Sequence, residues 1–436
     1  DDDADDYLRN RFKKLSARAL DGNRQALKLG FGVADELGLT PGKSMLQLPA
    51  GEKQKRLFIT GNEAAAFGFL AAGGRFYAGY PITPATEVMD WLGANLPQFD
   101  GVMVQAEDEL SAINMAIGAA LTGARAMTGS SSPGIALMGE SISHCGSAEI
   151  PMVIVNSQRA GPSTGMPTKI EQGDLGMMIS GGNGDFPRIV LSPGDASECF
   201  EIGALATNLA QIAQCPVFIA LDRALSQDSM TVPVFDLDSV EMNTGKMLSA
   251  TEVAELDEYK RYSVTEDGIS PWAVPGTPGG MSLVTGNERN EWGQVSAEPG
   301  NRVTMMDKRA RKLGTIKPLL PRAVSYGDTS SKIGIIGVGV AAGIISETYR
   351  LLENDGVRLK VHRPRVLFPM LDETLDFIAG CDRVYVVEHS ESGQLERVLS
   401  GAGANPDKLH GIRKYDGTPF WTDELAELIK DAEGAQ

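Results

Sequence analysis

Two short segments of this sequence carry side chains suited to binding a small anion. The first, Gly79–Thr86, places hydroxyl groups on a backbone that Pro81 and Pro84 stiffen. The second, Arg159–Lys169, combines an arginine, three hydroxyl groups and a lysine with two glycines that loosen the loop. An arginine offers a fork of two donors to a carboxylate, which a lysine does not match. Together the two segments predict a site for a small carboxylate.

Two further polar runs also follow expected strands. Glu107, Asp108 and Glu109 open a helix rich in small residues. These acids either complement the helix dipole or provide a desolvated carboxyl group that exchanges protons. The run Thr128–Gly134 precedes another helix, where its amides bind an anion or a serine caps the helix. The residues alone leave both alternatives open.

A glycine-rich turn, Gly337–Gly343, resembles a dinucleotide-binding fingerprint. The next expected strand ends in His362-Arg363-Pro364 and lacks the acidic ribose ligand of that fingerprint. The alternatives are a nucleotide-binding acyl-CoA enzyme and tight packing of a helix on a sheet. Among the four histidines, His144 lies in a serine-rich segment and is either structural or catalytic.

The composition excludes several classes of protein. The formal net charge of −17 argues against a surface for nucleic acids or anionic membranes. Four widely spaced cysteines form no CxxC pair, so we expect no iron–sulfur cluster, no structural zinc and no metal ligand set in this chain. No apolar run is long enough for a membrane span, and the first residues are acidic. These features favour a protein of the reducing cytoplasm.

Short β-rich runs alternate with helical runs from residue 55 to residue 232, which predicts βαβ units and a mainly parallel sheet. The expected strands are Leu57–Ile59, Arg75–Ala78, Val102–Val104, Ala124–Met127, Met152–Val155, Arg188–Leu191 and Val217–Ala220. Open parallel sheets bind their ligands at the carboxyl ends of the strands. The polar segments that follow these strands should therefore share one edge.

The rest of the chain has other sequence patterns. Residues 331–436 repeat the alternation as a smaller α/β unit, with strands expected at Ile333–Ile336, Arg358–Val361 and Arg383–Val387. Residues 233–330 are rich in proline, glycine and charge and predict an extended connecting arm with one helix near Val303–Leu313. Residues 1–54 predict two helices, Tyr7–Leu20 and Gln25–Leu37, and a linker, Pro41–Lys55.

The order of these motifs is similar to that of the α subunits of 2-oxoacid:ferredoxin oxidoreductases. The motifs are Gly61–Ala64, Tyr80–Pro84, Glu107–Glu109, Thr128–Gly134 and Arg159–Leu175, followed by Val284–Glu288 and Glu388–Leu395. The resemblance covers roughly residues 55–436. Within the family, the stretch Pro167–Asp174 looks most like that of 2-oxoglutarate enzymes (2-oxoglutarate synthase).

The resemblance implies a fold and an activity. The fold is a pyrimidine-type thiamine diphosphate domain over residues 55–232, followed by a transketolase C-terminal-like α/β domain over residues 331–436. The activity is oxidative decarboxylation of 2-oxoglutarate with coenzyme A to succinyl-CoA and CO₂, with reduction of ferredoxin, or the reverse. Pyruvate or a branched-chain 2-oxoacid remains an alternative substrate. A non-catalytic carboxylate-binding or assembly subunit remains an alternative role.

The resemblance also assigns residues to roles. Glu109 matches the carboxylate that hydrogen-bonds N1′ of the thiamine aminopyrimidine, with Glu107 as the alternative. Thr83 and Arg159 match the residues that hold the C1 carboxylate of the 2-oxoacid. Thr168 matches a position at the distal end of the substrate, and Lys169 is the candidate for a second carboxylate. The other expected contacts are Ser163 and Thr164 with the substrate and Tyr80, Pro81 and Ile82 with the cofactor.

Departures from the family pattern imply partners. Ala160 stands where many relatives have glycine, and the sequence contains no GDG motif for the diphosphate and Mg²⁺. The resemblance therefore implies a β subunit that carries the diphosphate and Mg²⁺ site and a [4Fe–4S] cluster, in an (αβ)₂ assembly that reduces ferredoxin. Residues 1–54 resemble the helical tail and linker of the γ domain that precedes this region in fused relatives, and that domain would complete the coenzyme A site.

Overall fold

The computed structural model describes residues 2–39, 51 and 54–434. The chain divides into two compact units, residues 1–55 and residues 56–436. In the first unit, helix α1 (Asp2–Arg11) is followed by α2 (Ala17–Glu36). The expected first helix, Tyr7–Leu20, is wrong at its end: Ser16 caps α2 by accepting a hydrogen bond from the Ala19 amide, so Leu20 belongs to α2. The expected linker, Pro41–Lys55, falls largely outside the described residues.

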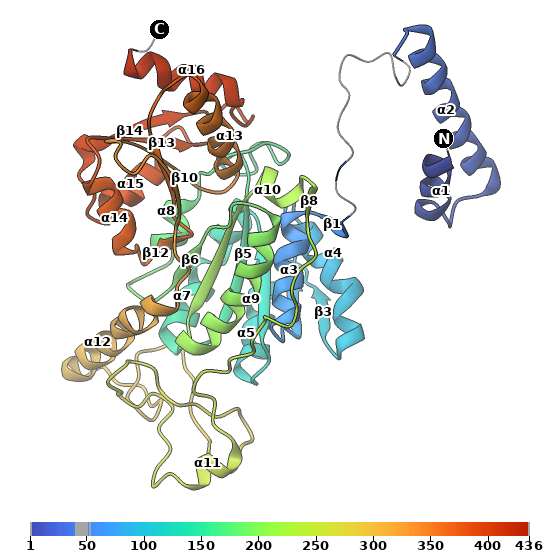
Figure 1. The fold of residues 1–436 in the computed structure, drawn as a ribbon. Helices are drawn as coiled ribbons and strands as arrows, with labels where there is room; N and C mark the ends of the chain where they lie inside the picture. Colours follow the sequence, from blue (N-terminus) through green and yellow to red (C-terminus); the bar gives the residue numbers. More distant parts are fainter. Residues whose placement is uncertain (1, 40–50, 52–53, 435–436) are drawn as a thin grey trace. The chain divides into compact units, whose positions relative to one another are not determined.

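A seven-stranded sheet forms the centre of the second unit (Figure 1). Its strand order is β12-β6-β7-β5-β4-β2-β3, and every neighbouring pair except β12 with β6 is parallel. The strands are β2 (Phe76–Gly79), β3 (Val102–Gln105), β4 (Ala126–Ser130), β5 (Met152–Gln158), β6 (Ile189–Leu191), β7 (Pro216–Asp222) and β12 (Val366–Phe368). The expected α/β fold with a parallel sheet is thus present.

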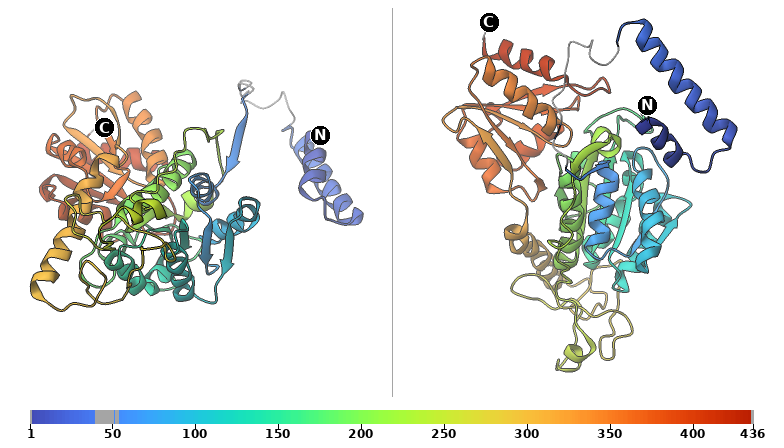
Figure 2. Two further views of the ribbon diagram at one scale, coloured as in Figure 1. Left: turned by 90° about the horizontal axis from the view of Figure 1, so that it is seen from below. Right: turned by 45° about the vertical axis from the view of Figure 1, so that its right-hand side comes forward.

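Helices cover both faces of this sheet (Figure 2). Two apolar cores lie between the sheet and these helices. One face is covered by α3 (Gly61–Ala71), α4 (Thr86–Asn95) and α9 (Ala196–Ala213). The other is covered by α5 (Glu109–Leu121), α6 (Ser132–Leu137), α7 (Gly139–Ala148) and α8 (Leu175–Ser180). Glycines let α3 and α9 pack closely, since a Cβ on Gly68 would lie 2.0 Å from the Phe200 carbonyl oxygen.

The first expected strand does not join the parallel sheet. β1 (Arg56–Ile59) pairs antiparallel with β8 (Met230–Pro233) in a separate two-stranded sheet. Phe58 is 76% exposed, whereas every residue of the central strands β5 and β7 is buried. The prediction of β1 as part of the parallel sheet is therefore wrong, because this strand has an edge environment with one open face. The short helix α10 (Arg223–Gln227) leads from β7 to β8.

A second sheet, of five strands, lies near the end of the chain in the order β14-β13-β10-β11-β9. Its strands are β9 (Val324–Gly327), β10 (Ile333–Gly337), β11 (Lys360–Arg363), β13 (Arg383–Glu388) and β14 (Leu409–Arg413). Only β9 is antiparallel to its neighbour. The helices of this C-terminal domain are α13 (Ala341–Asn354), α14 (Asp372–Ala379), α15 (Gln394–Gly401) and α16 (Thr422–Glu433).

The C-terminal domain and the main sheet are joined through a strand. β12 leaves the C-terminal domain and pairs antiparallel with β6 at the edge of the main sheet, with Val366 opposite Leu191. Three short 3₁₀ helices lie at Leu96–Phe99, Lys317–Leu319 and Pro406–Lys408. Among the described residues, no helix has the length and apolar character needed to cross a membrane.

The connecting segment between the two sheets contains no strand from residue 234 to residue 323, all of which are described. It contains the short helix α11 (Ala250–Ala254) and α12 (Pro299–Ile316), which includes the helix expected at Val303–Leu313. Figure 1 shows this segment at one end of the main sheet and the C-terminal domain toward the other.

Candidate functional site

The carboxyl ends of β2, β3, β4 and β5 bring the main predicted residues to one edge of the sheet. Thr83 follows β2, Glu109 follows β3, Ser132 follows β4 and Arg159 follows β5. The Arg159 amide lies 3.4 Å from the Ser132 hydroxyl oxygen, and that hydroxyl lies 3.5 Å from the Arg159 carbonyl oxygen. The polar segments therefore lie together at this edge of the sheet, as predicted.

The Arg159 side chain is 5% exposed, and part of its guanidinium group is left unsatisfied. Its Nη1 donates a hydrogen bond to the Thr83 carbonyl oxygen over 2.7 Å. Its buried Nε has no hydrogen-bond partner among the described residues. Burial lowers the pKa of Arg159, while the nearby carboxylates of Asp174 and Glu109 oppose that shift. A buried arginine with a free donor is suited to bind an anion that enters the site.

Glu109 is the buried member of the acidic run. It is the first residue of α5, and the preceding Asp108 caps the helix by accepting a hydrogen bond of 2.7 Å from the Ser111 amide. Glu109 is 5% exposed, whereas Glu107 is exposed. Of the two predicted carboxyl groups, Glu109 faces the protein interior.

Gly134 lets the Glu109 carboxyl group and the Ser130 hydroxyl approach its backbone closely. A Cβ atom at Gly134 would lie 2.0 Å from Ser130 Oγ and 2.6 Å from Glu109 Oε1. The hydroxyl groups of Ser130 and Ser131 are fully buried and have no hydrogen-bond partner among the described residues. Buried polar groups without partners are costly unless a ligand or water satisfies them. The pattern favours a bound polar group at this point.

The loop that follows Arg159 is exposed from Gly161 to Lys169 and is shaped by its own backbone. The Met166 amide donates to the Ala160 carbonyl oxygen (2.8 Å), and the Ala160 amide donates to the Lys169 carbonyl oxygen (3.1 Å). Gly165 has a φ of +46°, and a Cβ there would lie 1.9 Å from the Ala160 carbonyl oxygen, so this turn requires glycine.

The predicted substrate residues on this loop are all exposed to solvent. Ser163, Thr164 and Thr168 are exposed, and none of them makes a hydrogen bond with Arg159 or Thr83. The ammonium group of Lys169 has no ion pair within the described parts of the chain. On the neighbouring turn, Tyr80 is 39% exposed, and Pro81, Ile82 and Thr83 are half-buried.

Two residues that support the site were not predicted as site residues, although both lie in recognised motifs. Asn62 Nδ2 donates a hydrogen bond of 2.6 Å to the Pro84 carbonyl oxygen, and Asn62 Oδ1 accepts one of 3.0 Å from the Ser157 hydroxyl. Asp174 accepts a hydrogen bond of 3.1 Å from Asn156 Nδ2, and burial raises its pKa. Their place within these motifs was the available signal for both.

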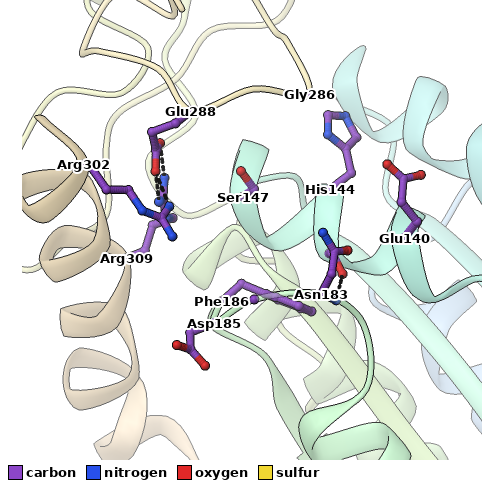
Figure 3. Close-up of a pocket in the computed structure, with 12 residues that line it drawn as sticks. Glu140, His144, Ser147, Asn183, Asp185, Phe186, Gly286, Glu288, Arg302 and Arg309 are labelled. Carbon is purple, nitrogen blue, oxygen red and sulfur yellow. Dashed lines mark hydrogen bonds and ion pairs between the residues drawn. The ribbon is translucent and has the colours of Figure 1, made fainter. Parts of the chain in front are cut away.

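His144 lies among a different group of residues, around a cavity (Figure 3). It lines a cavity of about 270 Å³ together with residues of α7, the loop Asn183–Phe186 and the connecting segment. Because α7 precedes β5 and the loop precedes β6, this cavity lies near the amino ends of the strands. Burial and Arg289 lower the pKa of His144, which Glu140 opposes. The catalytic alternative for His144 therefore receives no support from its position.

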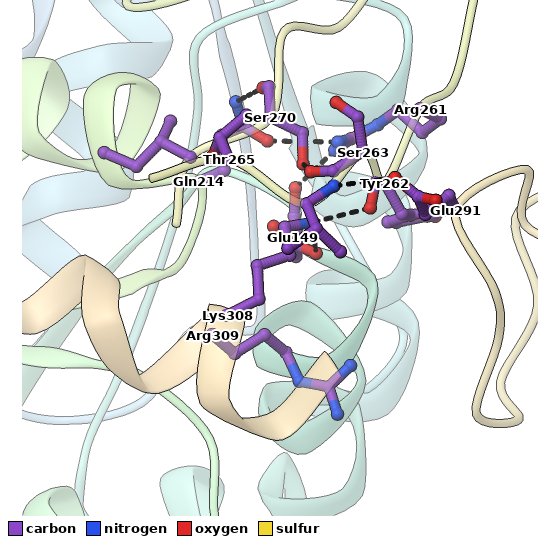
Figure 4. Close-up of polar contacts among 12 residues, drawn as sticks. Glu149, Gln214, Arg261, Tyr262, Ser263, Thr265, Ser270, Glu291, Lys308 and Arg309 are labelled. Atoms are coloured by element: carbon purple, nitrogen blue, oxygen red, sulfur yellow. Dashed lines mark hydrogen bonds and ion pairs between the residues drawn. The ribbon is translucent and has the colours of Figure 1, made fainter. Parts of the chain in front are cut away.

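A buried ionic cluster also lies at the amino ends of the strands (Figure 4). Glu149 lies between α7 and β5, and its two carboxylate oxygens lie 2.7 Å from Lys308 Nζ and 2.6 Å from Lys312 Nζ. Burial opposes ionisation of Glu149, but Lys312, Lys308 and Arg261 lower its pKa below the ordinary value. Burial lowers the pKa of Lys308 to about 8. This cluster fastens α12 to the sheet and is structural.

The glycine-rich turn after β10 is occupied by a side chain of the main sheet. The carboxylate of Asp222, at the end of β7, accepts a hydrogen bond of 2.7 Å from the Val340 amide. Gly339 has a φ of +59°, and a Cβ there would lie 2.3 Å from Asp222 Oδ2. Asp222 thus fills the position at which a dinucleotide phosphate would bind. The turn packs two domains together, which favours the packing alternative over nucleotide binding.

Comparisons with known proteins match most of the chain. Residues 68–294 match the family described as pyruvate flavodoxin/ferredoxin oxidoreductase, thiamine diphosphate-binding. The 2-oxoacid:ferredoxin oxidoreductase subunit alpha of Saccharolobus solfataricus is 38% identical over 418 residues, which are 91% of this chain and 65% of that protein. The 2-oxoglutarate synthase subunit KorA of Methanothermobacter thermautotrophicus is 34% identical over 379 residues, which are 85% of this chain and 97% of that protein.

A solved structure also matches nearly the whole chain. The 2-oxoglutarate:ferredoxin oxidoreductase from Magnetococcus marinus, with 2-oxoglutarate, coenzyme A and succinyl-CoA bound, superposes with a TM-score of 0.89 at 33% identity. The match covers 98% of this chain and 73% of that one. The chain thus spans less than two thirds of the Saccharolobus relative and almost all of the Methanothermobacter one.

Proposed function

This chain belongs to the family of 2-oxoacid:ferredoxin oxidoreductase α subunits, and from that premise we propose that it forms half of a thiamine-dependent active site for 2-oxoglutarate. The observation that carries the proposal is a buried arginine with an unsatisfied Nε next to a buried carboxyl group at one sheet edge. The name of the Methanothermobacter relative and the ligands named for the Magnetococcus structure support 2-oxoglutarate over other 2-oxoacids.

The residues around Glu109 fit the aminopyrimidine part of thiamine diphosphate. A carboxyl group and two buried hydroxyls without partners among the described residues suit a polar ring with donors and acceptors. When bound, thiamine diphosphate supplies a nucleophilic carbon and an electron sink for decarboxylation. The sequence contains no GDG motif, so the diphosphate and Mg²⁺ are assigned to the partner subunit.

In this proposal, each site residue has a separate task. Glu109 holds a proton at N1′ of the aminopyrimidine from its position at the start of α5. Arg159 and the Thr83 hydroxyl hold the C1 carboxylate of the 2-oxoacid. Thr168 and Lys169 face the distal end, where Lys169 would pair with the second carboxylate of 2-oxoglutarate. Ser163 and Thr164 contribute hydroxyl groups at the loop tip, and Tyr80, Pro81 and Ile82 line the cofactor side.

The proposed reaction needs groups that this chain does not supply. All four cysteines are free and buried, so the [4Fe–4S] cluster that passes electrons to ferredoxin is assigned to the β subunit. Coenzyme A is the acyl acceptor, and the working assembly is (αβ)₂ in the cytoplasm. Residues 1–54 are assigned to the tail of a γ-like domain, residues 55–232 to the pyrimidine domain, residues 233–330 to the arm and residues 331–436 to the C-terminal domain.

Arg159→Lys tests the proposal in the complex assembled with its β subunit. Lysine keeps the charge but loses the fork of donors, so 2-oxoglutarate-dependent ferredoxin reduction should fall by about 100-fold or more. Arg350→Lys is the matched control, because Arg350 is 70% exposed in its side chain and lies on α13. Unchanged turnover in Arg159→Lys, with the complex intact, would favour the non-catalytic assembly role instead.

A further inference from the structure

The C-terminal domain holds the back of the loop that carries Thr168 and Lys169. The Ile170 amide donates to the Gly417 carbonyl oxygen over 3.3 Å, and the Gln172 amide donates to the His389 carbonyl oxygen over 2.6 Å. Farther along, the Gly176 amide donates to Gln394 Oε1 over 2.8 Å. The three donor amides belong to residues that come after Lys169 in sequence. The loop tip before Lys169 is exposed.

Gln172 is the centre of this attachment. Its side-chain amide Nε2 donates to Asp222 Oδ2 (3.1 Å) and to the Val338 carbonyl oxygen (2.9 Å). Its Oε1 accepts a hydrogen bond of 3.2 Å from the His389 amide, and the residue is 1% exposed. Both the donor and the acceptor ends of the carboxamide are thus engaged, and they connect the loop to two separate segments of the C-terminal domain. Buried and satisfied in this way, the group fixes one geometry.

Gly417 packs directly against Lys169. Its φ is +85°, and a Cβ there would lie 3.0 Å from Lys169 Cβ and 3.1 Å from Met166 Cε. The Lys169 Cβ moves only with its backbone, so any side chain at residue 417 displaces the loop. The path of Lys169 therefore depends on the Asp416–Gly417 turn of the C-terminal domain.

Arg159, the other cation of the carboxylate site, has its own contacts in the domain of the main sheet. Arg159 contacts the Thr83 carbonyl oxygen in the turn after β2 and the Ser132 hydroxyl at the start of α6. The hydrogen bond from the Ala160 amide to the Lys169 carbonyl oxygen links the two cations of the site, but the contacts with the C-terminal domain lie on the Lys169 side of the loop. A disturbance of the contacts with the C-terminal domain should therefore act most strongly on ligands that reach Lys169.

We propose that the C-terminal domain sets which 2-oxoacid the site prefers, with Gln172 and Gly417 as positioning residues for Thr168 and Lys169. The inference rests on the proposed function, because it takes Lys169 as the group that meets the distal carboxylate. A dicarboxylic 2-oxoacid needs the loop in the position that these contacts define, and a monocarboxylic one does not. The domain interface then acts as a specificity determinant without touching the substrate.

The test compares kcat/KM for 2-oxoglutarate and pyruvate in the assembled complex. In Gly417→Ala, the ratio of the two values should shift against 2-oxoglutarate by roughly tenfold, the effect of one charge-assisted hydrogen bond. Gln172→Glu should shift it in the same direction, because a carboxylate would face the acceptors Asp222 and Val338. The matched control is Gly356→Ala: Gly356 has a similar φ of +82° but nothing within 4 Å of the added Cβ.

The outcomes separate this inference from the proposed function. A wild-type complex that does not turn over 2-oxoglutarate contradicts the proposed function and removes the premise of the inference with it. A wild-type complex that prefers 2-oxoglutarate, with both variants lowering the two kcat/KM values equally or leaving their ratio unchanged, overturns the inference alone. A ratio that shifts equally in Gly356→Ala also overturns it, since backbone strain would then explain the result.

Discussion

Arg159 Nη1 lies 2.7 Å from the main-chain carbonyl oxygen of Thr83 and donates a hydrogen bond to it. This contact joins the loop after β5 to the turn after β2, across the intervening strand β4. Asn62 holds the same turn from the other side through the Pro84 carbonyl oxygen. The turn and the guanidinium group are thus fixed together, which leaves the remaining arginine donors and the Thr83 hydroxyl for a ligand.

Glu109→Gln should abolish most of the turnover of the assembled complex. The substitution removes the group proposed to hold a proton at the aminopyrimidine, and the loss of such a proton-transfer group costs about 10²- to 10⁴-fold in kcat. Steady-state ferredoxin reduction at saturating substrate measures the effect. Glu107→Gln is the control and should change kcat by less than about twofold, because an exposed surface carboxylate contributes little. The reverse ranking would assign the role to Glu107.

Gly134→Ala should weaken binding of thiamine diphosphate to the complex. The new Cβ would stand 2.0 Å from Ser130 Oγ and 2.6 Å from Glu109 Oε1, so the carboxyl group must move. Titration of cofactor-depleted complex should give an apparent Kd raised by about tenfold or more. Gly343→Ala, on α13 with nothing within 4 Å of the added atom, should leave the Kd unchanged. Equal Kd values for both variants would contradict the assignment of Glu109 and its neighbours to the cofactor.

The sequence predicted the sheet and the edge that carries the site, because strand patterns and the polar segments after them are local signals. The carboxyl ends of parallel strands must meet, so Thr83, Glu109 and Arg159 were expected at one edge. The choice between Glu107 and Glu109 was not predictable in the same way. Both follow β3, and only the start of α5 at Glu109 turns one carboxyl group inward.

Several features of the structure depend on contacts between residues distant in sequence, which local patterns do not predict. Lys308 and Lys312 lie four residues apart on α12, a spacing that usually marks a solvated helix face, yet both are fully buried against Glu149. Gln172 lies in a recognised motif, but its partners are Asp222, Val338 and His389, which are far away in sequence. The sequence pattern of strand β1 is like that of the strands of the parallel sheet. Its place outside that sheet follows from its antiparallel pairing with β8, which is distant in sequence.

Acid should loosen the connecting segment before the C-terminal domain. Burial opposes ionisation of Glu288, but Arg309 and Arg302 lower its pKa to about 2 from an ordinary value of 4.5. A carboxylate with a depressed folded-state pKa stabilises the fold above its unfolded pKa, and this contribution is lost as the pH falls toward the folded value. Hydrogen exchange should therefore show α12 losing protection between pH 4.5 and pH 2, ahead of α13. Simultaneous loss in both helices would contradict this order.

Glu149→Gln should destabilise the protein far more than removal of a surface carboxylate does. Two lysines and Arg261 surround Glu149 in the buried cluster, and a neutral residue leaves their charge uncompensated. Breaking a buried pair in this way costs about 3–5 kcal/mol of unfolding free energy. Glu347→Gln removes an exposed ion pair with Arg350 and should cost less than about 1 kcal/mol. Thermal and denaturant unfolding of both variants measure the difference. Equal midpoints would mean that the cluster adds no net stability and that apolar contacts alone hold α12 against the sheet.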